Sequence, residues 1–299
     1  MLAGVLFCMT ASVLFAVLCY YTVFLAPLDG YEVFGWRVMG TVILVGLMIS
    51  LLKEWRPISK QLIKIFKTPQ HLLILLVCTA LISLQLFLFA WAPLNQSSEA
   101  LAMGYFLMPL SMVLCGRLIF QEQLSNYQKL AVTLATLGVI SNLVIHGNLS
   151  WVSMLVMLGY PPYFILKRQL GLSAIHSMFI EHLLMLPIGI LFVNAQNWSP
   201  DFFAVQQHGW LVIAGLGILG GVALLCFIAG SKLLPMSLFG MLGYLEPLLL
   251  FVVSLILPGS TFSPIDFFTY VPIWLAICCL ILNGWKSYQR TSPKAEYAA

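Results

Sequence analysis

Two carboxyl groups lie in the middle of long apolar stretches of the sequence. Glu181 and Glu246 lie near the middles of the predicted helices Ser173–Phe192 and Leu234–Leu257. A charge at the centre of a bilayer-spanning helix costs about 2.5–3.5 kcal/mol on insertion scales. A carboxyl group in such a site binds a proton more readily than in water, which suits reversible proton carriage. The alternative is a structural carboxyl that bridges two helices. Pro247 favours the transport role for Glu246, because proline frees a backbone carbonyl at a cavity.

Glu32 and Arg37 share one apolar stretch but do not share a helix face. Five positions separate them, which is about 140° around a helix axis. Arg37 lies deep enough to need water or an inward carboxylate, such as Glu99 or Glu181. The alternative for both is that their side chains extend to the outer interface. The sequence leaves Arg37 open between these two and favours the interface for Glu32.

Further polar-tipped side chains are candidates for lining a substrate cavity, because each joins apolar surface to a hydrogen-bonding group. They are Tyr105, Tyr244, Trp36 and Gln85, and the carboxyl groups of Glu99 and Glu32 are further candidates for the same cavity. The two tyrosines occupy matching places in two similar segments, Gly104–Leu110 and Gly243–Leu248. Each segment contains a proline, Pro109 or Pro247, at which we predict a helix kink.

No arrangement of catalytic residues stands out. The sequence has no H-E-x-x-H, no G-x-S-x-G and no P-loop. The histidines are scattered, and the cysteines lie in apolar stretches without C-x-x-C spacing. We therefore predict that the protein is not an enzyme and that it uses no metal and no cofactor.

The composition excludes a water-soluble globule. Of the 299 residues 61% are hydrophobic and 8% are charged, and the mean hydropathy is +1.00. A soluble domain is about half apolar and a quarter charged. The protein is therefore expected to be an all-α polytopic membrane protein, with the lipid bilayer as its surroundings.

Apolar stretches long enough to cross a bilayer core, about 20 residues each, recur along the whole chain and are separated by turn signals. We predict ten transmembrane helices: Leu2–Phe24, Glu32–Leu51, His71–Trp91, Ser98–Phe120, Tyr127–Ile145, Trp151–Leu166, Ser173–Phe192, Gly209–Gly230, Leu234–Leu257 and Phe267–Trp285.

Basic residues fall on alternate connections between these helices. They follow the second, fourth, sixth and eighth helices and fill the tail, whereas the other loops carry none. Cytoplasmic loops collect lysine and arginine, so both termini are expected in the cytoplasm. The net charge of +4 is explained by this distribution, and we predict no nucleic-acid partner.

The similar segments around Tyr105 and Tyr244 suggest an internal repeat. We divide the chain into a first five-helix repeat, residues 1–146, and a second, residues 147–299, which ends in a short basic tail. Because five is odd, the second repeat enters the bilayer inverted. Inverted repeats are a recurring plan of secondary transporters, with the substrate site near the midplane between the halves. With both halves in one chain, a monomer is sufficient; the oligomeric state stays open.

Several motifs resemble the RarD-like proteins of the EamA family, in the drug/metabolite transporter superfamily. The block Glu99–Phe106 with Pro109-Leu110 looks like that group's E-A-S-L-G-Y-F-x-N-P-L, and Gly116-Arg117 and Glu122 follow as expected. The resemblance implies two five-helix EamA repeats and transport of a metabolite or drug, often export, across the bacterial inner membrane. Departures include Trp36, where the group has His, and Met108, where it has Asn; Glu246 matches wider EamA proteins, which show Glu-Pro.

Taken together, these features predict a secondary active transporter of a small-molecule substrate. We expect a central cavity with alternating access, coupled to protons through Glu246, with Glu181, Arg37, Tyr105 and Tyr244 along the path. Two other classes stay open. A non-transporting membrane scaffold or partner subunit would leave the central carboxyl groups unexplained, and an intramembrane enzyme would need a nucleophile and base that the sequence does not offer.

Overall fold

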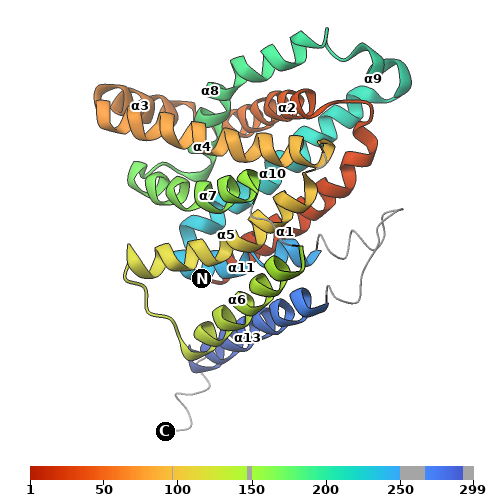
Figure 1. Cartoon of the computed structure of the whole chain (residues 1–299). Helices are drawn as coiled ribbons and strands as arrows, with labels where there is room; N and C mark the ends of the chain where they lie inside the picture. Colours follow the sequence, from red (N-terminus) through yellow and green to blue (C-terminus); the bar gives the residue numbers. More distant parts are fainter. Residues whose placement is uncertain (96, 147–149, 250–266, 292–299) are drawn as a thin grey trace.

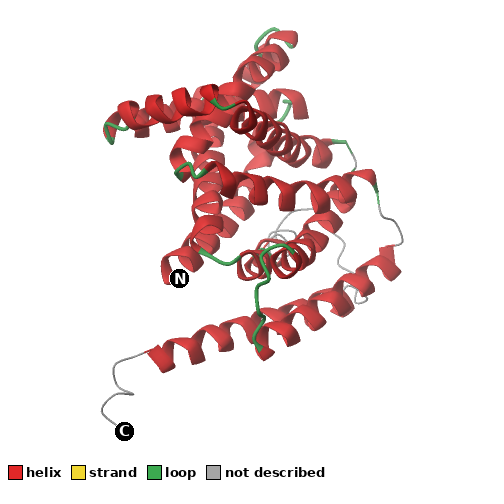
Figure 2. Cartoon of the chain, turned by 90° about the vertical axis from the view of Figure 1, so that its left-hand side faces the viewer, coloured by secondary structure: helices red, strands yellow, loops and turns green. Residues whose placement is uncertain are grey.

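In the part that the structure describes, all the regular secondary structure is helical. A computed structural model describes residues 1–95, 97–146, 150–249 and 267–291. Figure 2 shows long helices joined by short loops throughout these residues. The expected all-α architecture is confirmed.

The described helices, with the labels of Figure 1, follow the predicted segments closely. They are α1 (Leu2–Tyr21) with the 3-10 turn η1 (Thr22–Leu25), α2 (Gly30–Leu51), α3 (Trp55–Lys67), α4 (Pro69–Leu94), α5 (Ser98–Leu118), α6 (Asn126–His146), α7 (Trp151–Leu170), α8 (Ala174–Ala195), α9 (Pro200–Val205), α10 (Gly209–Leu233), α11 (Met236–Leu242) and α13 (Phe267–Thr291). Most predicted boundaries agree within about one helical turn.

The ninth predicted helix, Leu234–Leu257, is wrong as one continuous helix. α11 ends at Leu242, Gly243 and Tyr244 form a turn, and residues 245–249 are helical again. Pro247 explains the break, because proline has no N–H and its ring clashes with the carbonyl four residues earlier, here that of Gly243. The rest of this prediction lies outside the described residues.

Two short helices occur where we predicted only connections. α3 joins α2 to α4, and α9 joins α8 to α10. α3 is the amphipathic one: Ile58 and Ile65 are buried, whereas its basic residues are exposed. Neither helix is long and apolar enough to cross a bilayer.

The helices pack into a main body and a smaller pair at one end of it. In the body, α1 packs on α10, α2 on α8, and α5 and α4 on α7. α6 and α13 form the pair, at the bottom of Figure 1. The pair has its own apolar cluster, to which α5 contributes Phe106 and the turn after α11 contributes Tyr244.

The outer faces of the helices are apolar. Ile43 of α2 is 71% exposed and Val144 of α6 is 78% exposed. Such surfaces are stable only in lipid, where every backbone polar group is bonded inside a helix. Seven of the described helical segments are long and apolar enough to cross a membrane. The protein is a multi-pass membrane protein.

Candidate functional site

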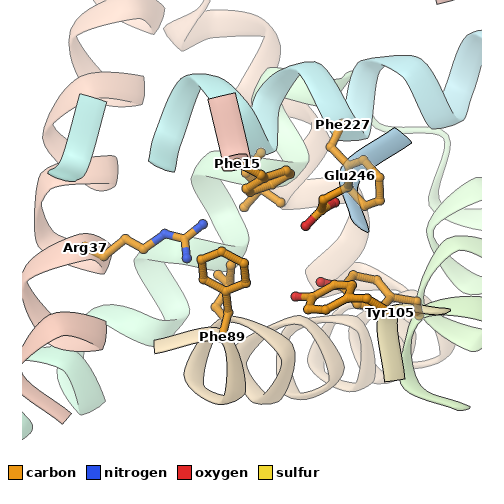
Figure 3. A pocket seen from close by; sticks show the side chains of 9 residues that line it. Phe15, Arg37, Phe89, Tyr105, Phe227 and Glu246 are labelled. Carbon is orange, nitrogen blue, oxygen red and sulfur yellow. The ribbon is translucent and has the colours of Figure 1, made fainter. Parts of the chain in front are cut away.

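A small cavity lies at the centre of the main body, where six helices and the segment after α11 meet. Its polar side chains are Arg37, Tyr105, Tyr160 and Glu246, and its apolar ones are Phe15, Leu86, Phe89, Leu224 and Phe227. Figure 3 shows the charged ends of Arg37 and Glu246 pointing into the cavity from opposite sides. Arg37, Glu246 and Tyr105, expected along a transport path, are therefore brought together.

Arg37 enters the cavity from α2 and is 3% exposed. Its Nη2 has no hydrogen-bond partner. Its guanidinium carbon lies 5.3 Å from the ring centroid of Phe89, a cation–π contact. A buried cation is costly unless it is paired, so this guanidinium is well suited to receive an anionic group in the cavity.

Glu246 enters from the short helical stretch after the break at Gly243 and is 4% exposed. The break lies against α5, since a Cβ on Gly243 would lie 3.5 Å from Cγ of Pro109. Among the described residues, no ion pair joins Glu246 to Arg37. The guanidinium of Arg37 and the carboxyl group of Glu246 therefore share one cavity without an ion pair between them.

Aromatic rings form the walls between Arg37 and Glu246. Tyr105 and Tyr160 are 6.3 Å apart between ring centroids, and Phe15 and Phe227 are 5.9 Å apart in an edge-on arrangement. The free space for the centre of a water molecule is about 10 Å³, roughly the minimum for one water. A larger solute would fit only after the surrounding helices move apart.

Glu181 of α8 lies in a separate buried cluster. Its carboxylate accepts hydrogen bonds from Nζ of Lys167 at 2.7 and 2.8 Å and from the hydroxyl of Tyr163 at 3.0 Å. Lys167 is 2% exposed and Glu181 is fully buried. The partner of Glu181 is therefore Lys167 of α7, not Arg37, and the geometry favours the alternative of a carboxylate that bridges two helices.

Comparisons with known proteins identify relatives of this chain, although no family model matches it. A relative in Pseudomonas aeruginosa, named chloramphenicol-sensitive protein RarD, is 38% identical over 98% of this chain and 97% of its own length. An uncharacterized transporter of Haemophilus influenzae is 35% identical over 99% of both chains.

The chain belongs to the RarD-like family. This confirms the resemblance to RarD-like members of the drug/metabolite transporter superfamily. Protein RarD of Escherichia coli is 26% identical over 97% of each chain. A solved crystal structure shares the fold, with a TM-score of 0.65 over 95% of this chain at 17% identity. Because several relatives are named transporters, membership supports a transporter and gives no indication of an enzyme.

In this RarD-like chain, Glu32 caps a helix and does not line the cavity. Its carboxylate accepts a hydrogen bond from the backbone N–H of Asp29 at 2.9 Å, and its own N–H donates to Asp29 at 2.8 Å. This is a capping box at the start of α2. The interval from Asp29 to Glu32 is the sequence signal for it.

Trp36 and Gln85 are buried but lie outside the cavity. The indole of Trp36 donates to Oγ of Ser199 at 3.1 Å and packs edge-on against Trp210. The Gln85 amide donates to the carbonyl of Leu155 on α7 at 3.0 Å. Both side chains join two parts of the chain, and neither contacts the space between Arg37 and Glu246.

Tyr244 and Glu99 are the remaining residues that we predicted to line the substrate cavity. Tyr244 is 1% exposed, packs in the cluster between α6 and α13, and has a hydroxyl without a hydrogen-bond partner. It is not a cavity residue, although its counterpart Tyr105 is. The side chain of Glu99 lies outside the described part of the structure.

Sequence reasoning missed most of the cavity wall. The missed side chains are Phe15, Leu86, Phe89, Tyr160, Leu224 and Phe227. Leu86 and Phe89, and likewise Leu224 and Phe227, are three residues apart and therefore share a helix face. In helices that are apolar all round, this spacing does not separate an inner face from a lipid-facing one.

Proposed function

We propose that the protein is a secondary active transporter that moves a small solute across the bacterial inner membrane by alternating access, with export as the direction. The observation that carries this proposal is the central cavity, in which a buried guanidinium without a full set of partners faces a buried carboxyl group. A solute with an anionic group on an apolar or aromatic body complements Arg37 and the rings around it. Glu246 is the proposed proton carrier.

Two inverted five-helix halves account for how the helices pair. In this arrangement, each helix of the first half has a counterpart in the second: α1, α2, α4, α5 and α6 correspond to α7, α8, α10, α11 and α13 in that order. Two of these counterpart pairs, α2 with α8 and α6 with α13, pack directly against each other. The contact of α1 with α10 likewise matches that of α7 with α4. This pattern supports a pseudo-two-fold arrangement, with the cavity between halves that rock against each other.

Contacts among the helix ends support the proposed topology, with both termini in the cytoplasm. Gly4 near the N-terminus contacts Leu234 at the end of α10, and Asn283 of α13 accepts a hydrogen bond from Ser125 at 2.9 Å. Arg168 at the end of α7 lies 4.9 Å from the ring of Phe120, just after α5. Each of these three contacts joins two helix ends that the predicted topology places in the cytoplasm.

A transport assay with purified protein in liposomes tests this function. The solutes are small aromatic carboxylic acids, aromatic amino acids and chloramphenicol, which has no acidic group and is included because of the name of the P. aeruginosa relative. We expect a proton gradient to drive accumulation of one of the acidic solutes. Arg37→Gln should abolish its binding, measured as loss of ligand-induced thermal stabilisation.

Glu246→Gln separates coupling from binding. If Glu246 carries the proton, this variant still exchanges solute across the membrane but no longer accumulates it against a gradient. Full gradient-driven accumulation by Glu246→Gln would remove Glu246 from the coupling role. No binding and no transport across the whole panel would favour a membrane scaffold.

A further inference from the structure

α3 is a short helix between two membrane-spanning helices. It runs from Trp55 to Lys67, which is about 20 Å at 1.5 Å per residue. It starts four residues after α2 ends and finishes two residues before α4 begins. Because α2 and α4 both span the membrane, α3 lies at the level where they leave it. Figure 1 shows it beside α4 at the edge of the molecule.

The side of α3 that faces away from the protein is basic. Ile58 and Ile65 are 2% and 3% exposed and pack into the main apolar core. The exposed basic residues lie opposite them: Arg56, Lys60, Lys64 and Lys67. At 100° per residue these four fall within an arc of about 80°. We call this set the basic stripe; α3 contains no acidic residue.

An apolar edge runs along one side of the basic stripe. Ile63 is 55% exposed and Phe66 is 61% exposed, although both are large apolar side chains. By helical geometry they lie between the stripe and the buried face. A basic face beside an exposed apolar edge is typical of helices that lie in the membrane interface, with the apolar edge at the boundary of the acyl chains.

α3 is held in place by the protein, so the stripe is preformed. Oε1 of Gln61 lies 2.7 Å from Nδ1 of His176, at the start of α8. The ring of Trp55 packs edge-on against Phe179, with centroids 5.5 Å apart, and the Trp55 indole donates to Oγ of Ser50 at 3.0 Å. Little ordering is required for this surface to meet a partner, which favours binding.

We propose that α3 is a binding surface for anionic phospholipid headgroups, with the basic stripe on their phosphates and with Ile63 and Phe66 at the acyl boundary. The charge of the stripe, the apolar edge and the position between two spans all fit a lipid surface. Basic segments next to the membrane attract anionic lipids by about 1 kcal/mol per residue, which is about fivefold in affinity at 25 °C. Three charges therefore contribute about a hundredfold.

Native mass spectrometry of the purified protein tests this proposal. The protein in neutral detergent is titrated with phosphatidylglycerol or with phosphatidylcholine, and the bound lipids are counted. We expect phosphatidylglycerol to bind more tightly, and its advantage to fall as salt is raised, because exposed charges are screened. The triple variant Lys60→Gln, Lys64→Gln, Lys67→Gln should lose about a hundredfold in affinity for phosphatidylglycerol and little for phosphatidylcholine.

Lys129→Gln is the matched control. Lys129 is an exposed lysine in the first turn of α6, away from α3, and its removal should leave lipid binding unchanged. A reporter on the C-terminus checks that the triple variant keeps its orientation, and its thermal unfolding without lipid checks the fold. Wild-type affinity of a folded triple variant for phosphatidylglycerol, or equal affinity of the wild type for both lipids, would overturn the proposal.

Discussion

Gly220 and Arg37 are in such close contact that a Cβ on Gly220 would lie 2.6 Å from Nε of the arginine. The stem of Arg37 therefore lies directly against the backbone of α10. Because glycine has no side chain, position 220 leaves room for the Arg37 stem and so determines where the guanidinium lies in the cavity. In the sequence, Gly220 has only the small-residue pattern that lets membrane helices approach closely.

We predict that Gly220→Ala displaces Arg37 and impairs the transporter without unfolding it. A misplacement of about 1 Å at a site can cost up to about a hundredfold, and we expect a loss of about 10- to 100-fold in solute affinity. Binding is measured by ligand-induced thermal stabilisation. Gly46→Ala is the control, because a Cβ there would meet only Phe179, at 3.4 Å. Equal affinity of Gly220→Ala and wild type would contradict this role.

The buried pair of Lys167 and Glu181 should be costly to break on one side. Lys167→Met leaves a buried carboxylate with only the Tyr163 hydroxyl as partner, and removing one member of a buried ion pair typically costs about 3–5 kcal/mol. The double variant Lys167→Met, Glu181→Gln removes both charges and keeps an acceptor for Tyr163. We expect it to recover most of the lost stability.

Thermal unfolding in detergent measures both variants of this pair. If the double variant is as unstable as Lys167→Met, the pair does not account for the loss and packing of the lysine stem does. Glu181→Gln alone should also destabilise, because it leaves the Lys167 ammonium without a charged partner.

Glu122 should stabilise the start of α11. Its carboxylate accepts hydrogen bonds from the backbone N–H groups of Met236 at 2.7 Å and Ser237 at 2.8 Å. Loss of a helix N-cap costs about 0.5–2 kcal/mol. Glu122→Ala should therefore speed hydrogen exchange at these two amides, while amides in α8 stay as in the wild type. Unchanged exchange at Met236 and Ser237 would show that the cap is dispensable.

The sequence predicts the helices better than it predicts the contacts between them. Apolar length and loop charge locate most spans, because the membrane imposes both. Glu246 and Arg37 are found because a charge in an apolar helix is rare. The sequence pattern places Lys167 in a loop, because a lysine after an apolar stretch is typical of a cytoplasmic connection; in the structure its side chain is 2% exposed.

α3 and Tyr160 are two features of the structure that the sequence pattern does not predict. α3 is too short and too polar to register as a span, and its basic residues read simply as loop charges. Tyr160 sits in an apolar helix with Pro161 and Pro162, and no periodicity distinguishes its cavity face from a packing face. Tertiary packing determines whether such a residue points into the cavity or against a neighbouring helix, and one sequence does not reveal this packing.

Substitutions of Gln85 test whether this buried side chain lines the path of the solute or only packs between helices. Its Nε2 donates to the carbonyl of Leu155, but its Oε1 is buried without a hydrogen-bond partner. Gln85→Leu removes the unsatisfied oxygen together with the donor at similar volume, and replacing buried polar groups by apolar ones of the same shape is close to neutral. We therefore expect unchanged transport and a stability within about 1 kcal/mol of wild type. Gln85→Ala should be destabilised by the space it leaves. A folded Gln85→Leu protein without transport would instead place Gln85 on the path of the solute.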